Sequence, residues 1–431
     1  MRCCWLTSGA IEIKGIELMT IVEIAKNARD AAQTLSSSSG IARAKALNGM
    51  AEQLLSVKEE LMAANAEDVA EARAVGISDA FVKRLAVTEK IFNYMVNRLR
   101  EAAALPDPVG RVLMGRTMPS GLKVSKVSVP LGVVAIIYEA RPNVTTDAAA
   151  VALKSANAVI LKGGSESIRS NRVLVKAMRN AIQEAGLPLD TVQFIDSRDH
   201  AVVTELLQQE AYINAVIPRG GKSLIKAVSA NTRIPVIKHY DGICHQYVSA
   251  HSDLDMAVAV VLNSKTERVE VCNALETLLV DSAVAEKFLP MMAKAFREHN
   301  VEMRGCERTC KIVSDAVPAT EEDWGMEYLA PIISIKIVNG LDEAIRHISM
   351  YGSGHTDGII TGSLQEAREF TARVDSASVM VNASTRLSGG GDYGMGAVVG
   401  ISTDKLHARG PVGPEELCSY KWIAEGNGHL R

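Results

Sequence analysis

The sequence predicts an α/β fold of two domains, each built around a parallel sheet. Its 431 residues are too many for one ordinary hydrophobic core, because single cores stop growing at about 250–300 residues. Strand-like runs alternate with helix-like runs from about residue 132 to 238, and the alternation starts again after Cys272. Such alternation favours right-handed β-α-β units with parallel neighbouring strands.

The N-terminal third is predicted to be helical. Residues 1–18 lack periodicity, and we expect them to be an extension outside the fold. From Met19 an amphipathic pattern predicts a helix that residues 36–39 interrupt, and helical periodicity resumes over 41–57 and 59–74.

Short strands begin after Pro106. Residues 122–129 alternate apolar and polar side chains, which predicts a strand with one face exposed. Residues 132–138 are continuously apolar, as expected of a parallel strand covered on both faces. Further helices are expected over 146–155, 167–185, 201–209 and 222–229, and further strands over 158–162, 192–196, 215–218 and 235–238.

A second α/β domain is predicted after Cys272. This order places Cys272 at the seam between two domains, where small-molecule sites are common. The expected strands are 277–280, 332–338, 357–360 and 378–381, and the expected helices are 283–298, 341–349 and 363–374.

The charge balance favours a small-molecule partner. Lys and Arg number 47 and Asp and Glu number 50, which gives a formal net charge of -3. We therefore expect neither nucleic-acid binding nor a solvating acidic tail. No stretch approaches the roughly 20 apolar residues that span a bilayer, so no membrane partner is expected.

The seven cysteines, at 3, 4, 244, 272, 306, 310 and 418, form no regular framework. No secretory pattern precedes them, and we expect a reducing, cytoplasmic location. Cys306 and Cys310 form a single pair, whereas a structural zinc site needs four ligands. We expect no metal.

Cys272 is the residue where we expect the chemistry. It follows a charged run that contains Lys265 and Arg268, and polar Asn273 is beside it. Nearby cations lower the pKa of a thiol and so increase the nucleophilic thiolate. The alternative is a buried, inert cysteine, because free cysteine is among the most buried residue types.

Two glycine motifs depart from known phosphate-binding patterns. Residues 220–223 look like the end of a P-loop, but Val216 replaces its first glycine, and residues 389–394 match a dinucleotide spacing without a helix after it. Gly220 and Gly221 still open a predicted helix whose N–H groups could cover a cofactor. Isolated histidines without metal or triad spacing are expected to be structural or surface residues: 200, 251, 299, 347, 355 and 429.

Ordered blocks of the chain resemble the gamma-glutamyl phosphate reductases of the aldehyde dehydrogenase superfamily, from about residue 19 to 423. Among them are Tyr138-Glu-Ala-Arg-Pro-Asn143 and Cys272-Asn-Ala-Leu-Glu-Thr. The other blocks are 129–133, 160–166, 217–221, 381–386 and 407–411.

The resemblance implies an aldehyde-dehydrogenase-like architecture of two Rossmann-like α/β domains plus a small β oligomerisation element. It places the NADP-binding domain at 19–110 and 130–245 and the catalytic domain at 246–395. The oligomerisation element is expected at 111–129 and 396–431. There, residues 419–423 look like a strand able to join a neighbour's sheet, so a homo-oligomer is expected.

The resemblance also implies roles for individual residues. Cys272 is the nucleophile, and the Asn143 side chain forms an oxyanion hole with the backbone N–H of Cys272. Lys162 reaches the adenosine ribose of NADPH, and Glu327 holds the nicotinamide ribose. The remaining expected cofactor residues are Gly163, Gly164, Ser165, Glu166, Gly220 and Gly221.

The substrate-binding candidates centre on arginines, because arginine binds carboxylates and phosphates through two parallel hydrogen bonds. The alternative is that some of them are surface or inter-subunit charges. The candidates are Arg141, Ser384, Thr385, Arg386 and Arg409.

The implied activity is NADPH-dependent reduction of L-glutamyl 5-phosphate to L-glutamate 5-semialdehyde, with a separate glutamate kinase supplying the substrate. Oxidising relatives use a glutamate base to activate water, but residues 237–245 contain none. His239 and Asp241 are the other bases in that segment. The alternatives are a hydrolytic NAD(P)-dependent aldehyde dehydrogenase and a non-catalytic α/β binding protein.

Overall fold

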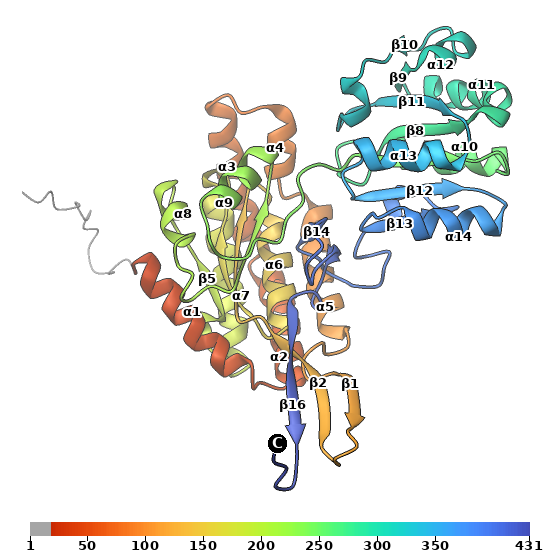
Figure 1. Ribbon diagram of the computed structural model, residues 1–431. Helices are drawn as coiled ribbons and strands as arrows, with labels where there is room; N and C mark the ends of the chain where they lie inside the picture. The colour runs from red at the N-terminus through yellow and green to blue at the C-terminus, as the bar shows by residue number, and fades with distance from the viewer. Residues whose placement is uncertain (1–18) are drawn as a thin grey trace, which may run out of the picture.

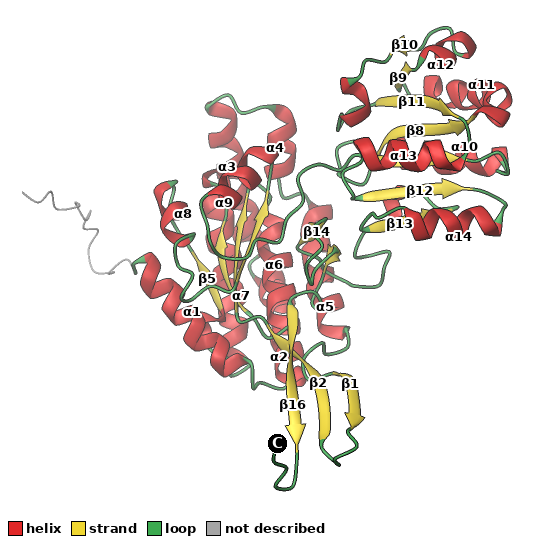
Figure 2. Cartoon of the chain, viewed as in Figure 1, coloured by secondary structure: helices red, strands yellow, loops and turns green. Residues whose placement is uncertain are grey.

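The computed structural model describes residues 19–431, and the predicted extension 1–18 lies outside the described residues. In this part of the chain, helices cover the two larger sheets, whereas a three-stranded sheet projects without helical cover (Figures 1 and 2). The N-terminal helices are α1 (Ile21–Leu35), α2 (Gly40–Ser56), α3 (Lys58–Ala74), α4 (Asp79–Leu85) and α5 (Glu89–Ala104).

A four-stranded parallel sheet organises the first domain, in the order β5-β4-β3-β6. Its strands are β3 (Val133–Tyr138), β4 (Ala158–Lys162), β5 (Val192–Phe194) and β6 (Ala215–Arg219). The connecting helices are α6 (Pro142–Lys154), α7 (Ile168–Glu184), α8 (Ala201–Leu206) and α9 (Lys222–Ala230), with short 3-10 turns η1 (Ser165–Ser167) and η2 (Leu189–Thr191).

Both faces of this sheet are buried. Successive side chains of a strand point to opposite faces, so Val134 and Ile136 pack with α2, α5, α6 and α7, whereas Val133 and Ala135 pack with α1, α8 and α9. This two-sided cover explains why residues 132–138 are continuously apolar.

A seven-stranded parallel sheet organises the second domain, in the order β10-β9-β11-β8-β7-β12-β13. Its strands are β7 (Cys244–Val248), β8 (Leu275–Asp281), β9 (Glu302–Gly305), β10 (Val317–Pro318), β11 (Ile332–Val338), β12 (Thr356–Ile360) and β13 (Ser378–Val381). The helices are α10 (Leu254–Thr266), α11 (Ser282–Glu298), α12 (Glu307–Ile312), α13 (Leu341–Tyr351) and α14 (Leu364–Arg373), with 3-10 turns η3 (Glu322–Gly325) and η4 (Thr385–Leu387).

A three-stranded antiparallel sheet projects away from both domains (Figure 1). It joins β1 (Val112–Thr117), β2 (Lys123–Pro130) and the C-terminal β16 (Cys418–Glu425), with β2 in the middle. The structure therefore combines the two predicted segments, but residues 419–423 pair with β2 of their own chain.

Two sequence expectations differ from the structure. Residues 235–238 form only an isolated bridge, Val216 to Val236. The segment 396–417, expected in the oligomerisation element, carries the small sheet of β14 (Gly400–Ser402) and β15 (Gly410–Val412). Several of its apolar residues, among them Val399, belong to the core of the first domain, and the apolar area that they bury there stabilises the fold.

Candidate active site

The carboxyl ends of β3 and β6 define the place where the predicted site residues gather. The chain runs outward from β3 to β4 and β5 and then returns to the other side of β3 to form β6. Ligands of open α/β sheets bind in the crevice that such a reversal opens. Tyr138 ends β3 and Arg219 ends β6, and α6, which carries Asn143, begins just after β3.

Cys272 lies in the loop between α10 and β8, and the segment between the two domains holds its backbone. A Cβ atom on Gly242 would lie 1.8 Å from the Cys272 carbonyl oxygen, so only glycine fits there. The Cys244 thiol donates to that same oxygen, with Sγ and O 3.2 Å apart. The nucleophile loop is thereby pressed against the inter-domain segment.

Two histidines lie beside the Cys272 thiol, which is half-buried. One ligand atom each from His239, Cys272 and His355 lies within 4.8 Å of the others. The two imidazole rings meet edge to face, with centroids 5.6 Å apart. Burial by itself raises the pKa of the Cys272 thiol, but the contact and charge of His239, with the charge of Arg219, more than offset this and lower that pKa.

The cations expected to activate Cys272 are used elsewhere. Lys265 is fully buried and pairs with Glu276, with Nζ and Oε2 2.6 Å apart. Arg268 pairs with Glu270 two residues further on. The sequence neighbourhood therefore predicts the direction of the pKa shift correctly. It is wrong about which groups lower the pKa, because those groups lie at the end of β6 and in the inter-domain segment.

Asn143 is held by a buried carboxylate one helical turn away. Its Nδ2 donates to Asp147 Oδ2 at 3.2 Å. Burial raises the pKa of Asp147 to about 7, against the lowering effects of Asn143 and of the Arg98 and Arg219 charges. Arg219 interacts electrostatically with both Asp147 and Cys272, which puts Asn143 in the neighbourhood of the nucleophile.

Arg141 borders the same space as an exposed side chain. Partial desolvation first, and then the charges of Arg219, Arg84 and Arg268, lower the pKa of Arg141, whereas the charge of Cys272 raises it. Several cations therefore surround the thiol, as an anionic substrate requires.

The other substrate candidates have partners within the protein. Arg386 donates to Glu267, with Nε and Oε2 2.6 Å apart, and to Asn273, the residue after the nucleophile. The Ser264 hydroxyl donates to the buried Ser384 hydroxyl. The backbone N–H of Thr385 donates to the Ser264 hydroxyl. Arg409 instead pairs with Asp375 at 2.7 Å. Arg386 thus lies at the nucleophile loop, whereas the contacts of Arg409 in the described chain are with the loop after α14.

The residues expected to hold a dinucleotide lie at the ends of β4 and β6. The buried Lys162 ammonium donates to the Gly163 carbonyl at 2.8 Å, and an ammonium carries three donors. A Cβ atom on Gly163 would come within 2.4 Å of Asn171, and one on Gly164 within 2.5 Å of Glu166. The Lys162 ammonium therefore has donors to spare for a ribose hydroxyl. Gly163 and Gly164 lack Cβ atoms, so the backbone beside it leaves room for the phosphates of a dinucleotide.

The glycines after β6 are held by Glu139. The Gly221 N–H donates to both carboxylate oxygens of Glu139 at 3.1 Å, and a Cβ atom on Gly220 would collide with that side chain. Ser165 begins the turn η1 that follows β4. Glu327 accepts the Gly242 N–H at 2.8 Å, so it lies against the same inter-domain segment that holds Cys272.

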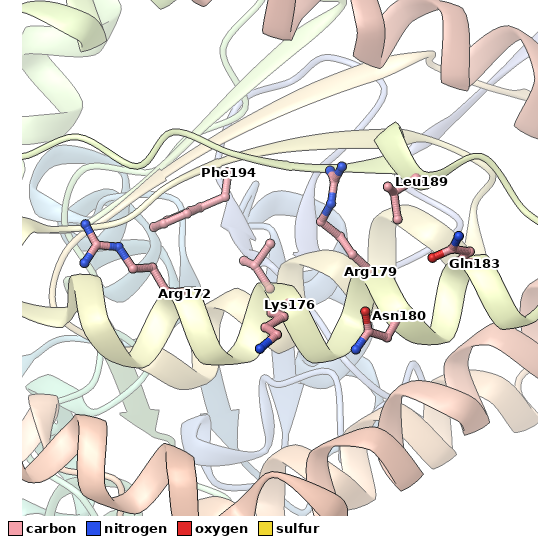
Figure 3. A pocket seen from close by; sticks show the side chains of 8 residues that line it. Arg172, Lys176, Arg179, Asn180, Gln183, Leu189 and Phe194 are labelled. Atoms are coloured by element: carbon pink, nitrogen blue, oxygen red, sulfur yellow. The ribbon is translucent and has the colours of Figure 1, made fainter. Parts of the chain in front are cut away.

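A separate hollow of about 320 Å³ lies along the outer face of α7 beside β5 (Figure 3). Its arginines are already paired, Arg172 with Asp196 and Arg179 with Asp190. None of the predicted site residues lines it. We therefore place the chemistry at Cys272 rather than in this hollow.

Three functional neighbours were not predicted: Arg219, Asp147 and His355. Arg219 lies within the 217–221 block, which carries the family resemblance, and Asp147 follows Asn143 by four residues, the spacing of neighbours on one helix face. Those signals could have found them. His355 was expected to be structural or at the surface, and no local pattern links it to Cys272, because only the pairing of β12 with β7 brings it there.

Comparisons with known proteins agree with this geometry. A family model described as "Aldehyde dehydrogenase family" matches residues 10–314. The gamma-glutamyl phosphate reductase of Thermotoga maritima is 43% identical over 96% of this chain and 100% of its own, with a TM-score of 0.93. The Saccharomyces cerevisiae gamma-glutamyl phosphate reductase is 31% identical over 96% and 99%, with a TM-score of 0.53.

A more distant structure shares the fold alone. An engineered glycolyl-CoA reductase with bound NADP+ is 13% identical over 94% of this chain and 96% of its own, with a TM-score of 0.66. No helix in the described part of the chain is both long and apolar enough to cross a membrane.

Proposed function

Since the chain belongs to the aldehyde dehydrogenase family, and within it to the gamma-glutamyl phosphate reductases, we propose that it reduces L-glutamyl 5-phosphate to L-glutamate 5-semialdehyde and phosphate. This is the second step of proline biosynthesis from glutamate. The enzyme is an oxidoreductase that uses a nicotinamide cofactor, and we infer that the cofactor is NADPH. The lowered pKa of Cys272 beside His239 and Arg219 is the observation that supports this function most directly.

Covalent catalysis begins with Cys272. His239 Nδ1 lies 2.9 Å from the Ile401 carbonyl, which can only accept, so that nitrogen carries the proton and Nε2 keeps a lone pair. We propose that Nε2 takes the thiol proton. The thiolate attacks the acyl carbonyl, a carbon–sulfur bond forms, and the carbon–oxygen bond to phosphate breaks, which leaves a thioester.

Negative charge develops on the carbonyl oxygen during this attack. Asn143 and the backbone N–H of Cys272 are the proposed donors, and one fixed donor of this kind lowers the barrier by about 3 kcal/mol. Asp147 orients Asn143 by accepting one of its two amide hydrogens. We propose that Arg141, together with Arg219, attracts the anionic substrate. Arg386, Ser384 and Thr385 would shape the nucleophile loop around it.

Lys162 and the glycines after β4 and β6 are the proposed cofactor contacts, together with Ser165, Glu166 and Glu327. When bound, the nicotinamide supplies the hydride that reduces the acyl group. A thioester is easier to reduce than a carboxylate, which suits cysteine to this task. Release of the aldehyde returns the Cys272 thiolate.

The decisive test runs the reaction backwards. We expect the purified protein to oxidise glutamate 5-semialdehyde with NADP+ only when inorganic phosphate is present, because the segment 237–245 offers no glutamate to activate water. Phosphate-independent release of free glutamate would move the assignment to the hydrolytic dehydrogenases. Parallel titrations with NADP+ and NAD+ in this assay test the cofactor choice.

Cys272→Ala tests the covalent step. We expect turnover to be lost while NADPH binding, measured by fluorescence, stays within about twofold of the wild type. The matched control is Cys310→Ala, since Cys310 lies away from the site, where its Sγ donates to the carbonyls of Gly305 and Ala316. Appreciable turnover by Cys272→Ala would rule out a thioester.

The surroundings of the reaction are also proposals. A separate glutamate kinase would supply the unstable acyl phosphate in the cytoplasm. A homo-oligomer is supported by β1 and β16, whose side chains are almost all exposed on both faces of the projecting sheet. Small antiparallel sheets need packing partners for stability.

A further inference from the structure

The group formed by Cys272, His239 and His355 is a candidate metal site as well as a catalytic one. Its three ligand atoms come from three separate segments and lie within 4.8 Å of one another. In a tetrahedral zinc site with Zn–S of about 2.3 Å and Zn–N of about 2.0 Å, ligand atoms are about 3.5 Å apart. Small side-chain rotations would bring the three ligand atoms from their present separations to the separations of such a site.

Both imidazoles are fixed in the tautomer that a metal needs. His239 gives its Nδ1 proton to the Ile401 carbonyl at 2.9 Å. Thr356 Oγ1 donates to Ser388 Oγ at 3.0 Å, so it accepts from His355 Nδ1 at 2.8 Å. Each ring therefore keeps its Nε2 lone pair. Hydrogen bonds from the far nitrogen orient metal-binding histidines in this way.

His355 supplies an independent sign of a missing partner. The side chain is completely buried, and its Nε2 atom has no hydrogen-bond partner among residues 19–431. A buried polar atom without a partner costs free energy, so such atoms are rare in folded proteins. A bound cation would give this nitrogen a partner.

The donor set selects the class of cation. One thiolate and two imidazoles suit zinc and similar thiophilic divalent ions rather than magnesium or calcium, which prefer oxygen. Cys244 is close by, but its thiol donates to the Cys272 carbonyl, so a fourth position is left to water. The charges of Arg219 and Arg141 oppose a divalent cation, which favours reversible binding over a permanent structural site.

We propose that Cys272, His239 and His355 bind a thiophilic divalent cation such as Zn²⁺, which displaces the thiol proton to solvent and reversibly blocks the nucleophile. The inhibitory consequence rests on the proposed function, whereas the binding itself does not. The expectation of no metal rested on the single Cys306–Cys310 pair and on the lack of metal spacing among the isolated histidines, His355 included, because spacing along the chain does not link Cys272, His239 and His355.

Cobalt absorption tests the site without using activity. We expect metal-free protein to bind one Co²⁺ with a thiolate-to-cobalt charge-transfer band that Zn²⁺ abolishes. Cys272→Ala should lose the band, and His355→Ala and the space-filling His355→Gln should weaken binding at least tenfold. The exposed His251→Ala and the double variant Cys306→Ser/Cys310→Ser should bind as the wild type does.

A band that survives in Cys272→Ala, or unchanged affinity in folded His355→Gln, would overturn the proposal. In the phosphate-dependent assay, Zn²⁺ should inhibit the wild type, and a chelator should restore at least nine-tenths of the rate. Inhibition that a chelator cannot reverse would contradict a reversible block. Correct cobalt spectra from a protein without reductase activity would refute the proposed function and leave the metal site standing.

Discussion

At the scale of single residues, the environment rather than the residue type decides the chemistry. Asp147 and Asp281 are both nearly buried aspartates. Asp281 Oδ2 accepts from the Tyr247 hydroxyl and its Oδ1 accepts from the N–H of Ala283, whereas Asp147 Oδ1 has no hydrogen-bond partner in the described part of the chain. Desolvation is the largest cause of the raised pKa of Asp147.

Asp147→Asn should reveal that pKa as a pH dependence of stability. The pKa of Asp147 is raised from 3.8 to about 7 on folding, so the folded protein holds a proton that the unfolded chain loses. The wild type therefore loses stability as the pH rises from about 4 to 7. The free energy of unfolding of Asp147→Asn, relative to wild type, should increase by about 2–3 kcal/mol between pH 5 and 8.

Urea unfolding followed by circular dichroism measures this difference, with the exposed Asp392→Asn as control. A difference between Asp147→Asn and wild type that does not change with pH would show that Asp147 keeps an ordinary pKa in the folded protein.

At the scale of elements, loops from different strands are joined by contacts that tolerate little change. The buried Lys265–Glu276 pair links α10 to β8 on either side of the nucleophile loop. Glu276 also accepts the Leu329 N–H at 3.2 Å, two residues after Glu327. The loop of Cys272 and the loop of Glu327 therefore share one buried carboxylate.

Gly242→Ala should move the nucleophile. Its methyl group would lie 1.8 Å from the Cys272 carbonyl oxygen, so the backbone of Cys272 must shift. Because misplacement by about 1 Å can cost roughly 100-fold in rate, we expect kcat to fall at least that far with the thermal midpoint changed by only a few degrees. Gly325→Ala, where a Cβ would meet no described atom within 4 Å, is the matched control. Wild-type kcat in Gly242→Ala would contradict the close approach.

Lys265→Met should destabilise the second domain. It leaves Glu276, which is fully buried, without its charge partner, and breaking a buried pair in this way costs about 3–5 kcal/mol. Lys265→Met/Glu276→Leu should recover most of this loss because both charges are gone. Lys311→Met removes an exposed pair and should change the free energy of unfolding by less than about 1 kcal/mol. Urea unfolding measures these free energies. If Lys265→Met and Lys311→Met lower the free energy of unfolding equally, then breaking a buried ion pair costs no more than breaking an exposed one.

At the scale of the whole molecule, the projecting sheet is the part that the single chain leaves uncovered. β1 exposes Val112, Leu113 and Met114, and β16 exposes Trp422 and Ile423. Contiguous exposed apolar side chains on such an element mark an interaction surface. We propose that a second copy of the chain covers it.

Trp422→Glu should therefore weaken self-association. A charge placed in an apolar contact must be desolvated without a partner, so we expect the apparent mass at micromolar concentration to fall toward 46.2 kDa, the mass of one chain. Size-exclusion chromatography with light scattering measures it. Met291→Glu, which changes an exposed apolar residue of α11, should leave the mass unchanged. If Trp422→Glu keeps the apparent mass of the wild type, β16 is not part of the interface.

Much of the fold was predictable because its signals are local. The predicted strands 332–338 and 378–381 match β11 and β13, since buried parallel strands are short apolar runs between polar turns. The helix α10 was missed, because its first two turns are apolar almost all round and have no amphipathic period to detect. The helix α6 begins at Pro142 rather than 146 because proline fits the first helical turn.

The sequence by itself determined the α/β class and the family, and it singled out Cys272 as the proposed nucleophile. These follow from periodicity and from motifs whose residues are contiguous. Only the tertiary structure decided that His239 and Arg219, rather than Lys265 and Arg268, lower the pKa of the thiol. Electrostatic interactions fall off with distance in space, and the folding of β6, β8 and β12 sets that distance independently of separation along the chain.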